Sequence, residues 1–286
     1  MTDKHQRLPH WLKRPLPTGQ KFARVLNTLK ELKLSTVCHS ARCPNQGECY
    51  SCGTATFMIM GEVCTRNCQF CAVAHGDVKP LSADEPQRLA QAVDKLNLKH
   101  VVITSVTRDD LPDGGAAHFA DVIETLQRQC PLVTVEVLTP DFQGNTDCLD
   151  IILAANCNVF NHNIETPRRL TKEIRKIADY DCSLSVLKYM ADAQDGPIVK
   201  SGFMLGLGEN SEDITEMLTD LKSAGVQMVT IGQYLRPTKD NIAVQKYYTP
   251  EEFKAIGDQA RAMGFVKVES GPFVRSSYHA EEAMQK

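Results

Sequence analysis

The sequence predicts an α/β fold, a partial (β/α)6 TIM-like barrel with an N-terminal and a C-terminal extension. Short apolar runs rich in Val and Ile alternate with segments of helical periodicity through most of the chain. This alternation is typical of parallel sheets and barrels. The six strand–helix units that can be counted fall short of a complete TIM barrel, which is why a partial barrel is expected.

The elements are expected in the following order. A polar N-terminal arm leads into a short helix over 22–34. The barrel strands are expected at 57–60, 100–106, 134–140, 159–164, 199–205 and 228–235. The helices of the barrel are expected at 82–96, 116–129, 146–156, 167–178, 181–193, 211–224 and 249–264. A final apolar run at 265–269 is expected to form an extra strand.

Two of these helices carry start signals. Ser211 precedes an acidic first turn and is expected to begin one helix. Thr249, followed by Pro250 and by Glu252 three positions on, has the pattern of a capping box. Gly264 is a suitable residue to end that helix.

The composition narrows the class of protein. The chain has 286 residues, a formal net charge of -3 and 42% hydrophobic residues, the balance of a soluble globular protein. This argues against intrinsic disorder and against a basic nucleic-acid-binding surface. No apolar run approaches the roughly 20 residues of a membrane span. Residues 1–7 are polar and show no secretory signal, so a cytoplasmic location is expected.

Cysteine usage is unusual. Of the 11 cysteines, seven lie between Cys38 and Cys71. An odd count without an export signal argues against a disulfide framework. Soft thiolates prefer zinc, copper(I) or iron–sulfur clusters, so we expect a metal centre in this block.

The strongest motif is Cys64-x3-Cys68-x2-Cys71, here called the downstream triad. Three thiolates on a cubane cluster leave one iron without a protein ligand, and that iron can take an external chelating group. The alternative is a zinc site completed by a distant Cys or His, since structural zinc needs four ligands.

This motif after a first strand resembles that of the radical S-adenosylmethionine superfamily. The resemblance implies a full or partial barrel and a [4Fe-4S] cluster on Cys64, Cys68 and Cys71. It also implies that the amino and carboxylate groups of S-adenosylmethionine chelate the fourth iron. One electron then cleaves the sulfonium and yields a 5′-deoxyadenosyl radical.

A second set of cysteines, Cys38, Cys43 and Cys49, lies just before the first strand and is here called the upstream triad. With its surroundings 42–58 and the C-terminal motif Arg275-Ser276-Ser277-Tyr278, it resembles the lipoyl synthase family. The resemblance implies an auxiliary [4Fe-4S] cluster on the upstream triad, with Ser277 as its fourth ligand. An alkoxide is a harder, less matched ligand for iron than a thiolate, so it would be displaced more readily.

Further polar residues are expected to bind the cofactor. Thr104 and Ser105 end a strand and precede a loop whose glycines permit close backbone approach, so they can meet the methionyl end. Phe70, inside the downstream motif, is assigned to the same site. The stretch 160–166 is similar to a motif of biotin synthase, and this resemblance implies that Asn163 and Glu165 contact the carboxylate and ribose.

Three further charged or polar side chains in the sequence are not expected to belong to the site. His162 is expected to be structural rather than a ligand. Lys200 and Arg236 could steer substrate, but solvated surface charge is the favoured interpretation.

The lipoyl synthase resemblance implies a sulfurtransferase that inserts sulfur at C6 and C8 of an octanoyl-lysine. The implied partners are octanoylated lipoyl carrier domains, namely 2-oxoacid dehydrogenase acyltransferase subunits and the glycine-cleavage H protein. An electron donor such as flavodoxin or ferredoxin and an iron–sulfur carrier are also implied, with no nucleic acid and no membrane span. The expected division is an extension with the upstream triad at 1–52, the barrel at 53–264 and the serine motif at 265–286.

Two alternatives stay open. The nearer one is another sulfur-inserting radical enzyme, such as biotin synthase. The more distant one is a non-catalytic zinc or iron–sulfur binding module.

Overall fold

The computed structural model describes residues 8–13 and 19–277. Its main sheet has eight strands in the order β1-β2-β5-β6-β7-β8-β9-β10. All neighbouring strands are parallel except β1, which runs antiparallel to β2. The strands are β1 Ser35–Thr36, β2 Thr56–Ile59, β5 His100–Ser105, β6 Thr134–Leu138, β7 Val159–Asn161, β8 Ile198–Leu205, β9 Met228–Gln233 and β10 Lys267–Gly271.

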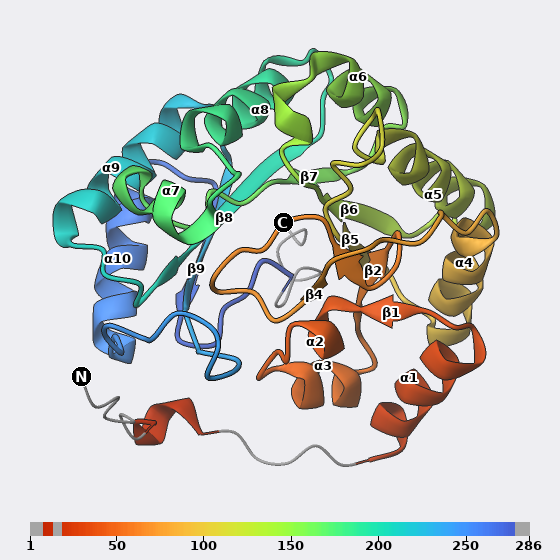
Figure 1. The fold of residues 1–286 in the computed structure, drawn as a ribbon, viewed down its shortest axis with the longest axis horizontal. Helices are drawn as coiled ribbons and strands as arrows, with labels where there is room; N and C mark the ends of the chain where they lie inside the picture. The colour runs from red at the N-terminus through yellow and green to blue at the C-terminus, as the bar shows by residue number, and fades with distance from the viewer. Residues whose placement is uncertain (1–7, 14–18, 278–286) are drawn as a thin grey trace.

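A helix follows each of the six strands from β2 to β9, and these helices form an outer ring around the sheet (Figure 1). The predicted partial barrel is confirmed, and β10 is the extra strand expected at its end. The helices of the ring are α4 Glu85–Leu96, α5 Ala116–Gln129, α6 Thr146–Ala154, α7 Arg168–Arg175, α8 Tyr180–Asp192, α9 Ser211–Ser223 and α10 Pro250–Ala262.

The N-terminal part adds smaller elements on the inside and at the edge of this ring (Figure 1). The expected helix over 22–34 is α1 Gln20–Glu31. The cysteine-rich block forms two short helices that the sequence did not predict, α2 Val37–Ser40 and α3 Gln46–Cys52. The other N-terminal elements are η1 His10–Leu12, β3 Val63–Cys64 and β4 Ala74–His75. A further short helix, η2 Phe142–Gly144, lies between β6 and α6.

The helix caps agree with the sequence at one site and differ at another. Thr249 and Glu252 form the predicted capping box of α10, with Gly264 at positive φ beyond its end. α9 begins at Ser211, as expected, but its N-cap is Asn210, whose side chain accepts from Asp213 N. Asn and Ser are similarly good N-caps, so composition alone did not separate them.

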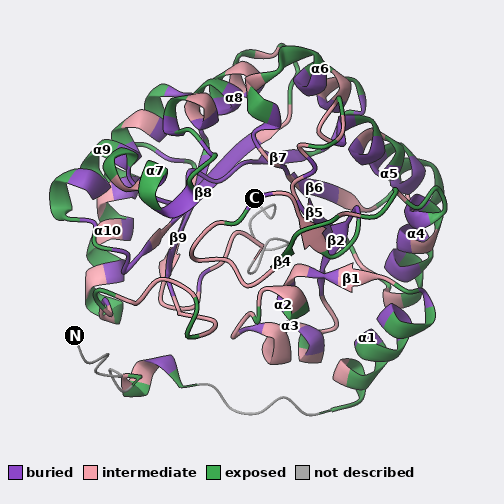
Figure 2. Cartoon of the chain, in the orientation of Figure 1, coloured by how far each residue is buried: buried purple, intermediate pink, exposed green. Residues whose placement is uncertain are grey.

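The strands are buried and the outward faces of the helices are exposed (Figure 2), as expected for a parallel sheet covered by helices. The interior also holds a buried charged cluster. Lys200 Nζ lies 2.8 Å from Glu136 Oε1, and His100 Nε2 lies 3.1 Å from Glu136 Oε2. The interpretation of Lys200 as a surface charge was wrong, because its side chain is 2% exposed. Among the described helices, none is long and apolar enough to cross a bilayer.

Candidate functional site

One cavity of about 360 Å³ lies where the carboxyl ends of the parallel strands meet. Parallel barrels place their chemistry at this end. Eleven of the twelve residues predicted for the site line this cavity, and Cys49 is the exception. The eleven are Cys38, Cys43, Cys64, Cys68, Phe70, Cys71, Thr104, Ser105, Asn163, Glu165 and Ser277.

The downstream triad lies on a loop that begins at β3. The Cys64 sulfur accepts hydrogen bonds from the backbone N–H of Arg66 at 3.4 Å and of Thr107 at 3.3 Å. Asn241 donates to the carbonyl oxygen of Cys71 at 2.8 Å and fixes the far end of the loop. Burial raises the pKa of Cys71 to about 12 and also raises the pKa of Cys68. Thiols in such a place become thiolates when a cation is bound.

Arg66, between the first two cysteines of this loop, joins it to two strands. Its guanidinium donates to Asp109 at 2.7 and 2.8 Å and to Asp141 at 2.7 Å with two nitrogens. Asp109 follows β5 and Asp141 follows β6. Although burial opposes it, Arg66 holds the pKa of Asp141 well below its usual range. No local sequence pattern reveals these ion pairs, because the partners are far apart in the chain.

The upstream triad lies on the two short helices of the N-terminal block. Cys38 is on α2, Cys43 follows α2, and Cys49 is on α3. Burial raises the pKa of Cys38 to about 11 and that of Cys49 to about 12. The neighbouring thiols of Cys38 and Cys43 raise the pKa of Cys49 further. The Cys43 backbone N–H donates to the Cys38 carbonyl at 2.9 Å, which fixes the turn between them.

The C-terminal segment 272–277 passes along the open edge of the barrel and ends beside the upstream triad. Asn45 donates to the carbonyl oxygen of Phe273 at 2.6 Å, and the Thr56 hydroxyl donates to Ser277 Oγ at 2.7 Å. Gly232 on β9 makes this approach possible: a Cβ there would lie 2.1 Å from the carbonyl oxygen of Val274. Tyr278, the last residue of the predicted motif, lies outside the described residues.

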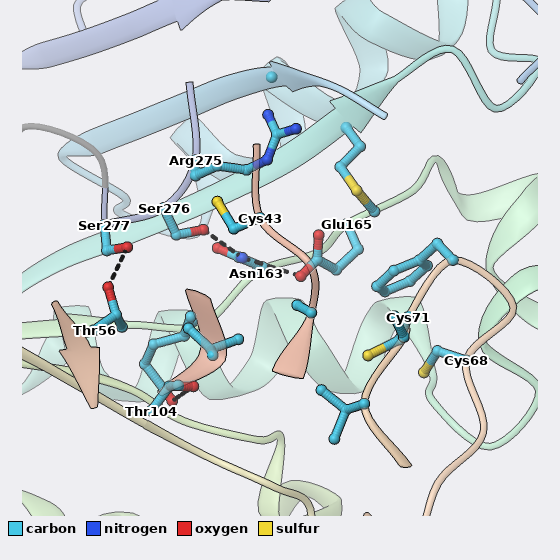
Figure 3. A pocket seen from close by; sticks show the side chains of 18 of the residues that line it. Cys43, Thr56, Cys68, Cys71, Thr104, Asn163, Glu165, Arg275, Ser276 and Ser277 are labelled. Atoms are coloured by element: carbon cyan, nitrogen blue, oxygen red, sulfur yellow. Dashed lines mark hydrogen bonds between the residues drawn. The ribbon is translucent and has the colours of Figure 1, made fainter. Parts of the chain in front are cut away.

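Asn163 and Glu165 follow β7 and point toward each other and toward the serine motif (Figure 3). Asn163 Nδ2 donates to Glu165 Oε1 at 3.0 Å and to Ser276 Oγ at 2.6 Å. Glu165 has a φ of 64°, which is strained for a residue with a side chain. Backbone hydrogen bonds of Glu165 with Gly202 and Met204 on β8 hold this conformation. Burial raises the pKa of Glu165.

Arg275 is the charged residue of the serine motif. Its guanidinium lies beside Gly232 and donates to the Val274 carbonyl at 2.6 Å, and its charge attracts both Cys43 and Glu165. Arg275 and Ser276 belong to the C-terminal motif, but the resemblance implied no role for either residue. Their contacts depend on the path of 272–277, which no local pattern reveals.

The cavity wall fits a polar ligand. Five of its residues have a buried polar atom with no hydrogen-bond partner among the described residues. These atoms are Ser105 Oγ, Thr139 Oγ1, His162 Nε2, Asn163 Oδ1 and Arg175 Nε. Buried polar atoms normally have partners, so an additional donor–acceptor group belongs here.

The thiols fit iron–sulfur clusters. All six cysteines of the two triads are free, and thiolates are the ordinary ligands of [4Fe-4S] clusters. No three Cys, His, Asp or Glu side chains of the described chain converge to suit one metal ion. A cubane carries its irons at separate corners, so its ligands do not need to meet at one point.

Sequence comparisons identify the relatives of the chain. The model of the radical S-adenosylmethionine superfamily matches residues 58–221, and the model of the N-terminal domain of lipoyl synthase matches residues 1–43. A lipoyl synthase of Treponema denticola is 52% identical over 278 residues, which cover 97% of this chain and 95% of that protein. The chain belongs to the lipoyl synthase family. A lipoyl synthase of Nitrosococcus oceani is 50% identical over 281 residues, covering 98% and 87% of the two chains.

Lipoyl synthases are radical S-adenosylmethionine enzymes that transfer sulfur, and they use a [4Fe-4S] cluster with S-adenosylmethionine. Solved structures agree on the fold. Methylornithine synthase has a TM-score of 0.58 at 15% identity, covering 87% of this chain and 78% of that one. SuiB of Streptococcus suis, bound to S-adenosylmethionine, has a TM-score of 0.56 at 14% identity, covering 71% and 46%. The sequence-based prediction of fold and family is therefore confirmed.

Proposed function

We propose that this lipoyl synthase family member inserts sulfur at C6 and C8 of an octanoyl group attached to a lysine of a lipoyl carrier domain. The observation that carries the proposal is the shared cavity: Cys43, Cys68 and Ser277 all line it. A substrate carbon in this cavity is within reach of groups held by both triads. A zinc-binding module would not need this arrangement.

The proposed ligands divide into two sets. Cys64, Cys68 and Cys71 bind the cluster that meets S-adenosylmethionine, and Cys38, Cys43, Cys49 and Ser277 bind the auxiliary cluster. When bound, the first cluster supplies the electron that cleaves the cofactor and the second supplies sulfur. Unactivated methylene C–H bonds have no acidic proton for a base, so radical chemistry is required.

The remaining residues bind and shield the reactants. Phe70, Thr104, Ser105, Asn163 and Glu165 are proposed to contact S-adenosylmethionine. The Glu165 carboxylate can accept from ribose hydroxyls. An octanoyl chain needs an apolar wall. The cavity offers one made of Met58, Val106, Leu138, Phe203 and Met204.

We further propose the partners, location and division of the chain. The carriers are 2-oxoacid dehydrogenase acyltransferase subunits and the glycine-cleavage H protein. A flavodoxin or ferredoxin delivers electrons, an iron–sulfur carrier rebuilds the auxiliary cluster, and the protein acts in the cytoplasm. Residues 1–52 supply the upstream triad, 53–264 the barrel and 265–286 the serine motif.

Anaerobic turnover of an octanoyl-lysine peptide, followed by mass spectrometry, tests the proposal. The reconstituted protein with a reductant and S-adenosylmethionine should convert the peptide to a product that carries two sulfur atoms. Cleavage of S-adenosylmethionine without any sulfur in the peptide would contradict the proposal. Zinc without sulfide in the anaerobically purified protein would contradict it as well.

A further inference from the structure

Ser276 connects the proposed cofactor site to the segment that carries Ser277. Its Oγ accepts a hydrogen bond from Asn163 Nδ2 at 2.6 Å, and the same nitrogen donates to Glu165 Oε1 at 3.0 Å (Figure 3). The next residue, Ser277, accepts from the Thr56 hydroxyl at 2.7 Å. Asn163 and Glu165 are here called the cofactor pair. One peptide bond therefore separates Ser276, which contacts this pair, from Ser277, the proposed cluster ligand.

The hydrogen bonds of Asn163 determine what its side chain can offer a ligand. An amide nitrogen has two hydrogens, and here Glu165 and Ser276 accept one each. The amide oxygen is buried and has no partner among the described residues. Asn163 thus presents an acceptor, which suits a ribose hydroxyl. A carboxylate would need the N–H groups that Ser276 and Glu165 already occupy.

The other residues of the segment have different contacts. Asn45, beside the upstream triad, holds the Phe273 carbonyl, and Val274 packs over Gly232. Arg275 attracts both Cys43 and Glu165. Within 273–277, Ser276 is the described residue whose side chain is hydrogen-bonded to the cofactor pair.

We propose that Ser276 couples the binding of S-adenosylmethionine to the position of Ser277. This inference rests on the proposed function, in which Asn163 and Glu165 contact the cofactor and Ser277 binds the auxiliary cluster. A cofactor that fixes Asn163 also fixes Ser276, and the segment that carries Ser277 then loses freedom. Thermodynamic linkage requires the reverse effect: a well-seated segment orients Asn163 and strengthens cofactor binding. Ser276 is thus a positioning residue.

The test uses the full-length protein, reconstituted anaerobically and left unreduced so that S-adenosylmethionine is not cleaved. Equilibrium binding of S-adenosylmethionine and amide hydrogen exchange of residues 274–277, with and without this ligand, are measured. The wild type should bind the ligand and show slower exchange in the segment. Ser276→Ala should bind about fivefold more weakly, as expected for one lost hydrogen bond, and should lose most of the ligand-induced protection.

Two further variants exclude a general structural effect. Ser276→Thr keeps a hydroxyl and should restore both affinity and protection. Ser270 on β10, away from the cavity, donates to the Phe253 carbonyl on α10; Ser270→Ala removes this hydrogen bond and should behave as the wild type does.

The outcomes separate the two proposals. If the wild type binds S-adenosylmethionine without any change in exchange at 274–277, the coupling is refuted while the function stands. Wild-type affinity and protection in Ser276→Ala would refute it in the same way. A wild type that does not bind S-adenosylmethionine at all would overturn the proposed function, and the coupling with it.

Discussion

At the scale of single residues, Ser277 separates two parts of the proposed reaction. Its hydroxyl is held by Thr56 at the proposed auxiliary site, on the other side of the pocket from Cys68 and Cys71 (Figure 3). Ser277→Ala should therefore spare 5′-deoxyadenosine formation more than lipoyl product formation. Both products are quantified by mass spectrometry in one anaerobic reaction. Equal loss of the two would show that Ser277 does not serve the donor site, and Cys68→Ala should abolish both.

His162 shows how burial fixes the state of a titratable group. Its Nδ1–H donates to the Thr139 carbonyl at 2.9 Å, and a carbonyl only accepts, so the imidazole is one defined neutral tautomer. Burial lowers the pKa of His162 to about 4 from an ordinary 6.5. The expectation that His162 is structural fits this geometry, although its Nε2 remains without a described partner.

The lowered pKa of His162 predicts a pH dependence of stability. Below pH 6.5 the unfolded chain binds a proton that the folded protein does not bind until about pH 4. The free energy of unfolding of the iron-free protein should therefore fall by about 3 kcal/mol across this window as the pH is lowered. Urea unfolding of His162→Gln should lack this component. His75→Gln, at an exposed position on β4, should show the same fall as the wild type. If the free energy of unfolding depends equally on pH in the wild type and both variants, His162 is not the responsible group.

At the scale of elements, close approach rather than hydrogen bonding places the C-terminal segment on β9. A methyl group at position 232 would lie 2.1 Å from the Val274 carbonyl, which is far inside van der Waals contact. Gly232→Ala should therefore displace 274–277 and accelerate its amide exchange at least severalfold. Gly271→Ala is a matched control, because its Cβ would meet Val274 Cγ2 at an ordinary 3.5 Å. Unchanged exchange in Gly232→Ala would contradict this packing.

The barrel elements were predictable because their signals are local. The helices α4 to α10 and the strands β2 and β5 to β10 follow from periodicity and from caps such as Thr249, whose partners are three residues away. The helices α2 and α3 were not predicted, because cysteines dominate 38–52 and obscure any apolar period. Their shape is fixed by contacts such as the Thr36–Tyr50 hydrogen bond, which a sequence pattern does not show.

The site was predictable where a motif supplied it. Both cysteine triads and Ser277 could be named from spacing and resemblance, and eleven of the twelve named residues line the cavity. Arg66 and Asp141 were missed because an ion pair across 75 residues leaves no local signal. Lys200 was misjudged because a lone charge within an apolar strand carries no sign of its partner Glu136.

At the scale of the whole molecule, the charged cluster of Lys200, Glu136 and His100 lies in the interior of the barrel. Burial alone would raise the pKa of Glu136, but Lys200 and His100 together outweigh it and hold the pKa below its ordinary value. Both side chains are 2% exposed, so solvent screens the pair little. The pair links β6 and β8 across the sheet.

Lys200→Met should destabilise the whole fold by about 3–5 kcal/mol, because it leaves a buried carboxylate without its cation. Urea unfolding at neutral pH measures the loss. Lys254→Met, in an exposed pair with Asp258 on α10, should change the free energy of unfolding by less than about 1 kcal/mol. If the two variants lost similar free energy of unfolding, the buried pair would contribute no more to stability than the exposed pair.

The open edge of the barrel has a consequence for the lifetime of the enzyme. Among the described residues no backbone ladder joins β10 to β1 or β2; side-chain bonds such as Asn45 to Phe273 and Thr56 to Ser277 cross that edge instead. Parting these bonds leaves every strand pair of the sheet intact. In the proposed function the auxiliary cluster is consumed in each turnover. A replacement cluster can then enter through this edge while the sheet stays folded.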